Sequence, residues 1–389
     1  MKPMRSLPKI TARSATLGAI IALALPCAPA MADGVMRRMF FPARAAEYSG
    51  PSDSVSFFIF WTTAFFFVLL MGLMAIFVVK YRRRPGQAAP RSPSHNTPLE
   101  LAWSGIPLIL LGMMFFFGAR LYIEMRTPPI DSTVINVTAQ KWGWTWEYPG
   151  GEQSLESVTL ANVSSPVFAV PVGKPVRLVM NSTDVIHSLY IPAFRDKVDV
   201  IPNRYTTYWF RAEKIGEYHL YCAEYCGDQH SQMMALIKVM SDADYQEWLA
   251  EQADTSAIPL VELGRKLSIS AGCLACHSLD GRPGTGPSWK NIWGNTHVMT
   301  DGESVKVDEN YIRESILEPN ARIVAGYPAQ MPTYQGRFSD RELRAFIAYI
   351  ASLSDDGAED AERMMEEDDA EQEASEADSP QASVPTTDF

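Results

Sequence analysis

The sequence predicts a membrane protein of several domains: a transmembrane helix pair, an all-β domain, an all-α domain and an acidic tail. Three observations lead to this fold class. Two apolar stretches are each long enough to cross a bilayer. The segment after them alternates apolar and polar residues as β-strands do, and the next segment has the spacing of amphipathic helices. A chain of 389 residues is long enough for several separate cores.

The N-terminus has the composition of a secretory signal peptide. Basic residues precede an apolar run from Ala15 to Leu25, and Ala30-Met-Ala32 offers a small-residue cleavage site. We expect residues 1–32 to be removed, which leaves 33–53 as the N-terminal segment of the mature chain.

A transmembrane hairpin is predicted over residues 54–122. Its apolar stretches run from about Val55 to Val79 and from about Leu101 to Tyr122. The short loop between them is basic, which places it in the cytoplasm by the positive-inside rule; the basic residues are Lys80, Arg82, Arg83, Arg84 and Arg91. Everything after the second helix is then outside. The alternative, a buried helix pair of a soluble protein, fits poorly with so long an uninterrupted apolar run.

Residues 123–246 have the pattern of a β-sandwich or barrel. Short alternating runs such as 133–138 and 175–180 are separated by Pro, Gly and Asn turns. A polar linker is expected over 247–258. Residues 259–353 read as a small helical domain, which ends in a capped amphipathic helix.

The last segment, 354–389, holds fourteen acidic residues against the single Arg363. Its charge of −13 exceeds the net −11 of the whole chain, so the rest is close to neutral. Because the segment is strongly acidic and poor in apolar residues, it is predicted to be disordered. A docking arm for a basic redox partner is the alternative. Nothing in the sequence supports nucleic-acid binding.

A soft-metal motif falls on the loop between the last two predicted strands. Two thiols, an imidazole and a thioether lie within twelve residues, as Cys222, Cys226, His230 and Met233, and the distant His187 offers a second imidazole. This donor set favours copper, and two cysteines four apart can bridge two copper ions. The alternatives are a structural zinc or a short disulfide. Zinc has no use for Met233.

A second motif, Cys273-Leu-Ala-Cys276-His277, is the pattern that attaches haem c through two thioethers, with the histidine as axial ligand. A redox or zinc CxxC is the alternative, but no partner ligands lie nearby in the sequence. We expect the sixth iron ligand to be Met331, in a Pro-rich loop, because a Met/His pair suits electron transfer. Met299 is the rival.

The remaining cysteine, Cys27, lies in the predicted signal peptide. An alternative role is lipid attachment, which Pro26 directly before it does not favour. With Cys27 removed, the mature chain has no unassigned thiol.

On these motifs the chain resembles subunit II of a haem-copper cytochrome c oxidase, in the caa-type form with a cytochrome c domain fused at the C-terminus. The resemblance extends to Leu353 and implies a cupredoxin-like fold for the β domain. It also implies a binuclear copper centre, CuA, with His187 and His230 as terminal imidazoles, Cys222 and Cys226 as bridging thiolates, Met233 as a weak ligand and Glu224 through its backbone carbonyl. The Glu224 side chain would help to hold magnesium at the boundary with subunit I.

The resemblance assigns roles to two further residues. Trp142 occupies the position that accepts electrons from cytochrome c, although Lys141 stands where many members have Gln; an aromatic core or interface residue is the alternative. Glu100 matches an acidic residue at the cytoplasmic mouth of a proton channel; a snorkelling carboxylate at a helix start is the alternative.

The function implied is electron input to a terminal oxidase of the bacterial inner membrane, with the copper and haem domains on the periplasmic side. A reduced donor, such as cytochrome c, would supply electrons that pass through haem c and copper to subunit I. There oxygen is reduced to water and protons are translocated. The chain has six histidines and none in its membrane helices, so oxygen reduction must occur in subunit I, with subunit III as a further expected partner.

Two other functions remain open from the sequence. A nitric oxide reductase can use the same copper centre in its electron-input subunit, and the gas consumed would distinguish the two. A membrane-anchored copper carrier would need no haem, so the CxxCH motif argues against it.

Overall fold

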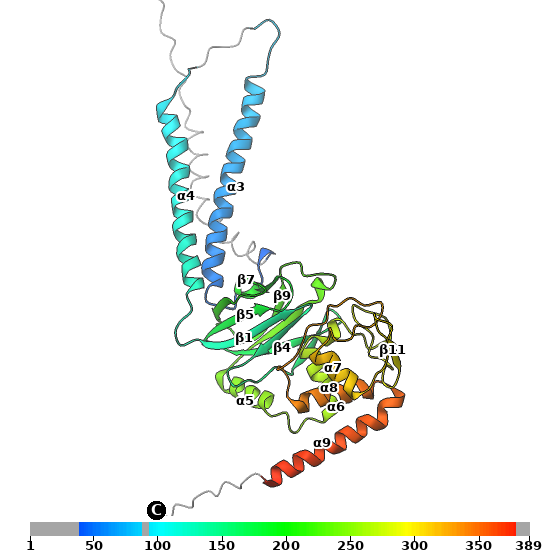
Figure 1. Cartoon of the computed structure of the whole chain (residues 1–389). Coiled ribbons are helices and arrows are strands. Elements are labelled where there is room, and N and C mark those ends of the chain that lie inside the picture. Colours follow the sequence, from blue (N-terminus) through cyan, green and yellow to red (C-terminus); the bar gives the residue numbers. More distant parts are fainter. Residues whose placement is uncertain (1–38, 88–92, 379–389) are drawn as a thin grey trace, which may run out of the picture. The chain divides into compact units, whose positions relative to one another are not determined.

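The computed structural model describes residues 39–87 and 93–378 (Figure 1). The predicted signal peptide, Cys27 and Arg91 lie outside the described residues. The chain divides into two units, Met1–Arg44 and Ala45–Phe389, and every element below belongs to the second. The predicted fold class is confirmed: two long apolar helices are followed by a β domain and then a helical domain.

The hairpin consists of α3 (Ser49–Lys80) and α4 (Thr97–Arg126), drawn in blue and cyan in Figure 1. With 32 and 30 residues, both are long and apolar enough to span a bilayer. Their apolar side chains are largely exposed, as lipid or a partner subunit requires. The α4 helix begins at Asn96, whose side chain accepts a hydrogen bond from the Leu99 N–H, while the Glu100 carboxylate accepts one from the Asn96 N–H.

The membrane helices are tied to the β domain by a buried ion pair. Arg195 Nε donates to Asp53 Oδ1 at 2.8 Å, and both side chains are almost fully enclosed. On the other helix, Trp209 Nε1 donates to the Glu124 carbonyl at 3.2 Å. These contacts join both membrane helices to the β domain.

The β domain is a sandwich of two sheets whose inner faces share one core. The first has the order β2-β1-β5-β8 and the second β3-β4-β10-β9-β6-β7. β1 pairs in parallel with β5, and β4 with β10, while the other pairs are antiparallel. The strands are β1 (Thr133–Gln140), β2 (Gly143–Glu147), β3 (Ser157–Leu160), β4 (Val163–Pro171), β5 (Pro175–Ser182), β6 (His187–Ile191), β7 (Asp196–Val200), β8 (Thr206–Arg211), β9 (Gly216–Cys222) and β10 (Met234–Met240).

The predicted linker over 247–258 begins inside a helix, and its boundary is corrected here. The α5 helix (Asp242–Ala253) starts at the Ser241 cap and buries Tyr245 and Trp248 against the sandwich. The Trp248 Nε1 also donates to Glu156 at 2.8 Å. Residues 247–253 thus belong to this helix, and the non-helical link is confined to 254–259.

The helical domain packs α6 (Leu260–Ser270) against α8 (Asp340–Ser352), with α7 (Glu309–Leu317) and a short hairpin of β11 (Thr296–Val298) and β12 (Ser304–Lys306) beside them. The two main helices meet at Gly264, where a Cβ would overlap the Ala345 carbonyl oxygen. Only glycine permits this approach. The Ser339–Glu342 capping box starts α8 where the sequence predicts.

The acidic segment predicted to be disordered contains a helix, α9 (Ala358–Asp378). Ala361, Met364 and Asp368 lie on one face, and this face is buried. The Asp368 carboxylate is 2% exposed and accepts from Arg341 Nη2 at 2.9 Å. Average composition hides this narrow stripe, which is why the sequence predicts disorder. Residues 379–389 lie outside the described residues.

Replacing Asp53 by Ala should lower the stability of the full chain by about 3–5 kcal/mol, because the Arg195 charge would be left buried without this partner. Thermal unfolding in detergent, followed by tryptophan fluorescence, measures the change.

The matched control is Glu47→Ala, since Glu47 pairs with Arg211 at 3.0 Å but each side chain is 35% exposed. Its cost should stay below about 1 kcal/mol. Equal costs for the two variants would contradict the assignment of Asp53 as the anchor.

Candidate functional site

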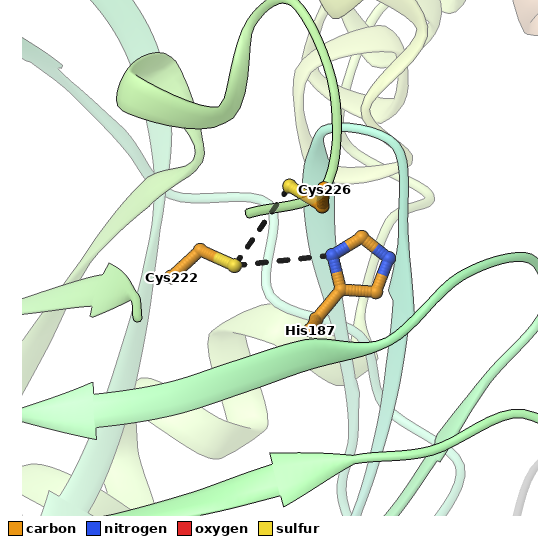
Figure 2. Close-up of side chains that lie close together, drawn as sticks. All are labelled: His187, Cys222 and Cys226. Carbon is orange, nitrogen blue, oxygen red and sulfur yellow. Dashed lines mark hydrogen bonds between the residues drawn. The ribbon is translucent and has the colours of Figure 1, made fainter. Parts of the chain in front are cut away.

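Three buried side chains from two neighbouring strands and a loop converge in the β domain (Figure 2). His187 begins β6, Cys222 ends β9, and Cys226 lies on the β9–β10 loop. The two Sγ atoms are 3.8 Å apart, and His187 Nδ1 is 3.9 Å from Cys222 Sγ. Their potential ligand atoms all lie within 4.8 Å of one another.

The other predicted donors surround the same thiols. His230 Nδ1 is 3.4 Å from Cys226 Sγ, and Met233 Sδ is 3.7 Å from it. The Glu224 carbonyl oxygen is 3.2 Å from Cys222 Sγ. The structure thus brings together all six donors that the sequence proposes for copper.

Strand pairing explains this convergence. Leu189 lies opposite Cys222 in the β6–β9 register, which places His187 beside the end of β9. The Cys222 N–H donates to the Met233 carbonyl at 3.1 Å and closes the loop at its base. Within the loop, Gly227 has a φ of 123°, and a Cβ there would lie 3.1 Å from Trp142 Cζ2. The buried Trp142 therefore packs directly on the loop.

The distances in this cluster distinguish between a disulfide, a zinc site and a copper site. A disulfide needs an S–S distance of about 2.05 Å, so the 3.8 Å separation leaves Cys222 and Cys226 as two thiols. Tetrahedral zinc would leave the thioether and the carbonyl unused. Thiolate, imidazole and thioether together suit copper.

Hydrogen bonds change the pKa values of the two thiols in a way that favours binding of a cation. The hydrogen bond from the Cys226 thiol, helped by His187, lowers the pKa of Cys222 to about 4. The same interaction, together with burial, raises the pKa of Cys226. The pair loses its first proton readily and holds the second until a positive charge compensates the two sulfurs.

Asp184 orients His187. Its Oδ1 lies 2.9 Å from His187 Nε2, so that nitrogen donates and Nδ1 faces the thiols. Burial disfavours the imidazolium, but Asp184 and Cys222 outweigh it and raise the pKa of His187. The sequence analysis missed Asp184; its place three residues before His187, a predicted metal ligand, was the available signal.

A cavity lies in the helical domain. Cys273, Cys276, His277 and Met331 all line it, with apolar side chains between them. The rival Met299 is instead 2% exposed within the core cluster and is not part of this lining. The cavity is therefore an apolar chamber with the CxxCH motif in its wall.

His277 is fixed from three sides. Its Nδ1 donates to the Pro287 carbonyl at 2.7 Å, which leaves Nε2 free to ligate a metal. Trp289 stacks on the ring with centroids 5.0 Å apart. A Cβ on Gly286 would lie 2.8 Å from His277 Cε1, so no side chain fits there. Burial lowers the pKa of His277 and keeps the imidazole neutral.

The two cysteines of the CxxCH motif have the opposite electrostatics to Cys222. Burial raises the pKa of Cys273 to about 12 and that of Cys276 to about 11. A redox or zinc pair works as thiolates, which these surroundings disfavour. Uncharged sulfurs in thioether bonds to haem suit them.

Other predicted residues lie apart from these clusters. Glu224 has an exposed side chain, and in the described part of the chain the cluster of metal-capable groups contains only His187, Cys222 and Cys226. Glu100 lies in the first turn of α4 at its capping position.

Replacing Gly286 by Ala should displace the His277 ring and convert a low-spin haem to a high-spin one, while both thioether bonds remain. Optical spectra of the holoprotein would show the change. The adjacent Thr285→Ala, which removes atoms from the cavity wall, should leave the spectrum unaltered. An unchanged spectrum in the glycine variant would contradict the steric argument.

Three family models match the chain in the order of its domains. The transmembrane domain of cytochrome c oxidase subunit II matches residues 37–121, and the periplasmic domain of the same subunit matches residues 133–240. Cytochrome c matches residues 261–354. The resemblance inferred from the sequence is confirmed by these matches.

Individual relatives agree. The alternative cytochrome c oxidase subunit 2 of Bradyrhizobium diazoefficiens is 30% identical over 214 residues, which cover 50% of this chain and 77% of the relative. Cytochrome c oxidase subunit 2 of Alkalihalophilus pseudofirmus is 28% identical over 300 residues, 74% of this chain and 82% of the relative. The crystal structure of the periplasmic domain of subunit II of cytochrome oxidase of Bradyrhizobium japonicum is 30% identical, covers 33% of this chain and 97% of that chain, and has a TM-score of 0.31. The chain belongs to the cytochrome c oxidase subunit 2 family, as a member with a cytochrome c domain at its C-terminal end.

Proposed function

We propose that this chain is the electron-input subunit of a terminal cytochrome c oxidase in the bacterial inner membrane. It accepts electrons from a reduced donor, cytochrome c or a similar protein. It passes them through haem c and a binuclear copper centre to the haem-copper centre of subunit I, where oxygen is reduced to water and protons are translocated. The observation that carries the proposal is the presence, in one folded unit, of a buried soft-donor cluster and an apolar cavity walled by CxxCH.

The donor distances support a set of copper ligands. Cys222 and Cys226 would hold two copper ions through their thiolates, with His187 and His230 as imidazole ligands and Met233 and the Glu224 carbonyl as weaker ligands. Bound copper and haem each take up and release one electron. The chain contributes rigidity: the ligand loop is closed at its base by a backbone hydrogen bond and packed beneath Trp142. Donors held in this way keep their positions when the charge changes.

The residues of the cavity wall support a set of haem ligands. Cys273 and Cys276 would carry the thioether bonds, and His277 Nε2 would ligate the iron. Met331 would be the second iron ligand, because it lines the cavity while Met299 is packed in the core. A Met/His pair raises the haem potential into the range useful for electron transfer.

The remaining roles depend on partner subunits. Oxygen reduction belongs to subunit I, and subunit III is a further expected partner. The exposed Glu224 carboxylate would complete a magnesium site only with groups from subunit I, and Glu100 would act at the mouth of a proton channel. Trp142 would pass electrons to the loop on which it packs. No observation favours a nitric oxide reductase, and a copper carrier would leave the helical cavity without a purpose.

The full chain, produced with haem c maturation and copper, should contain two copper ions and one haem. Its electron paramagnetic resonance spectrum should show one electron shared by two coppers. Cys226→Ser should abolish that signal and retain the haem, whereas His277→Ala should perturb the haem and retain the copper signal. Zinc or a single copper at this site would overturn the proposal.

Met331→Leu should lower the haem potential and remove the low-spin Met/His spectrum, because an apolar side chain cannot ligate iron. Redox titration of the holoprotein measures both effects. Met299→Leu is the matched control and should leave the ligation unchanged. The reverse result would assign the sixth position to Met299.

A further inference from the structure

A buried amide of the β domain binds the helical domain. Gln140, the last residue of β1, is 2% exposed. Its Nε2 donates to the Ala271 carbonyl at 2.6 Å and to Tyr334 Oη at 2.7 Å, and its Oε1 accepts from Arg337 Nη1 at 3.3 Å. Both ends of this side chain therefore bind the helical domain.

The partners of Gln140 flank the two sides of the haem cavity. Ala271 precedes the CxxCH motif by two residues, and Tyr334 follows Met331 by three. Tyr334 Oη also donates to Ala271 at 3.1 Å, and the Arg337 guanidinium lies 5.0 Å from the centre of the Tyr334 ring. One side chain of the β domain thus binds both segments that carry the proposed haem ligands.

The backbones of the two domains also meet at this point. A Cβ on Gly143 would lie 3.1 Å from the Gly272 Cα, and Gly272 itself has a φ of 76°. Two glycines face each other here, and a side chain on Gly143 would crowd the facing backbone. The segments around Gly143 and Gly272 therefore both contribute to the contact between the two domains.

Docking brings the wall of the haem cavity to the copper cluster. Lys141, next to Gln140, lines the cavity together with Cys276. The Lys141 N–H donates to Asp184 Oδ2 at 2.8 Å, and the other oxygen of Asp184 accepts from His187 Nε2 at 2.9 Å. Two hydrogen bonds through Asp184 thus connect Lys141, in the cavity wall, to His187, a proposed copper ligand.

We propose that Gln140, Tyr334 and Arg337 form a latch that holds the haem domain on the copper domain, so that electrons pass between the two centres within one chain. The latch rests on the function proposed above, and Gln140 is a positioning residue. In the transfer one electron leaves the haem iron, which is oxidised, and the copper pair is reduced by one electron. No bond forms or breaks, and no proton moves. Because tunnelling weakens steeply with distance, an undocked haem domain would transfer slowly.

The test is Gln140→Leu in the full chain, with Gln335→Leu as the control. The control makes the same substitution on an exposed residue next to Tyr334. In the Gln140 variant the Ala271 carbonyl loses its amide donor, and the loss of such buried hydrogen bonds enlarges the undocked population roughly five- to hundredfold. Hydrogen exchange at the amides of 140–143 and 271–276 should accelerate by that factor. The rate of haem-to-copper transfer after a light pulse should fall, with copper and haem content unchanged.

Unchanged exchange in Gln140→Leu would overturn the latch, and so would slower transfer without faster exchange. Should this variant fail to fold, Gln140→Asn shortens the amide and should give the same two changes. Hydrogen exchange on the protein without copper still reports the docking, so a chain that binds no copper pair would refute the proposed function without deciding the latch.

Discussion

The pairing of β9 with β10 is the constraint on which the copper cluster depends. β10 lies between β4 and β9 in the larger sheet, so the strand that leaves the ligand loop is held on both edges. The loop starts at Cys222 and returns at Met233, and these two residues are joined by a backbone hydrogen bond. A slip of one residue in this pairing would turn the donors away from the buried face. The position of every ligand on the loop is thus set by the register of the sheet.

In the helical domain, the candidate ligand His277 is positioned by other contacts. The two main helices of this domain cross closely at Gly264, and His277 is held by a carbonyl, a stacked indole and a glycine. A backbone carbonyl and a buried indole thus orient the histidine together. In both domains glycine stands where a side chain would collide with a functional group.

Local patterns could predict the proposed ligands because most lie within a few residues of one another. The twelve residues from Cys222 to Met233 and the CxxCH motif each carry their donors on one short segment. What the sequence could not predict are contacts between distant segments. Gln140 and Tyr334 are 194 residues apart, and α9 is ordered by an ion pair between Arg341 and Asp368. Hydrophobic periodicity does not indicate which distant residues form such contacts. Average composition likewise does not reveal that one face of an acidic helix is buried.

The two cysteine pairs of this chain differ in the pKa values of their thiols, and the surrounding residues cause the difference. Hydrogen-bond donors lower the pKa of Cys222 to about 4, whereas burial raises the pKa of Cys273 to about 12. At neutral pH the first pair therefore presents a thiolate, and the second keeps its thiols. Copper binds thiolate far better than thiol. The surroundings of Cys222 thus suit a thiolate that binds a soft metal, whereas those of Cys273 suit an uncharged sulfur, as in a thioether.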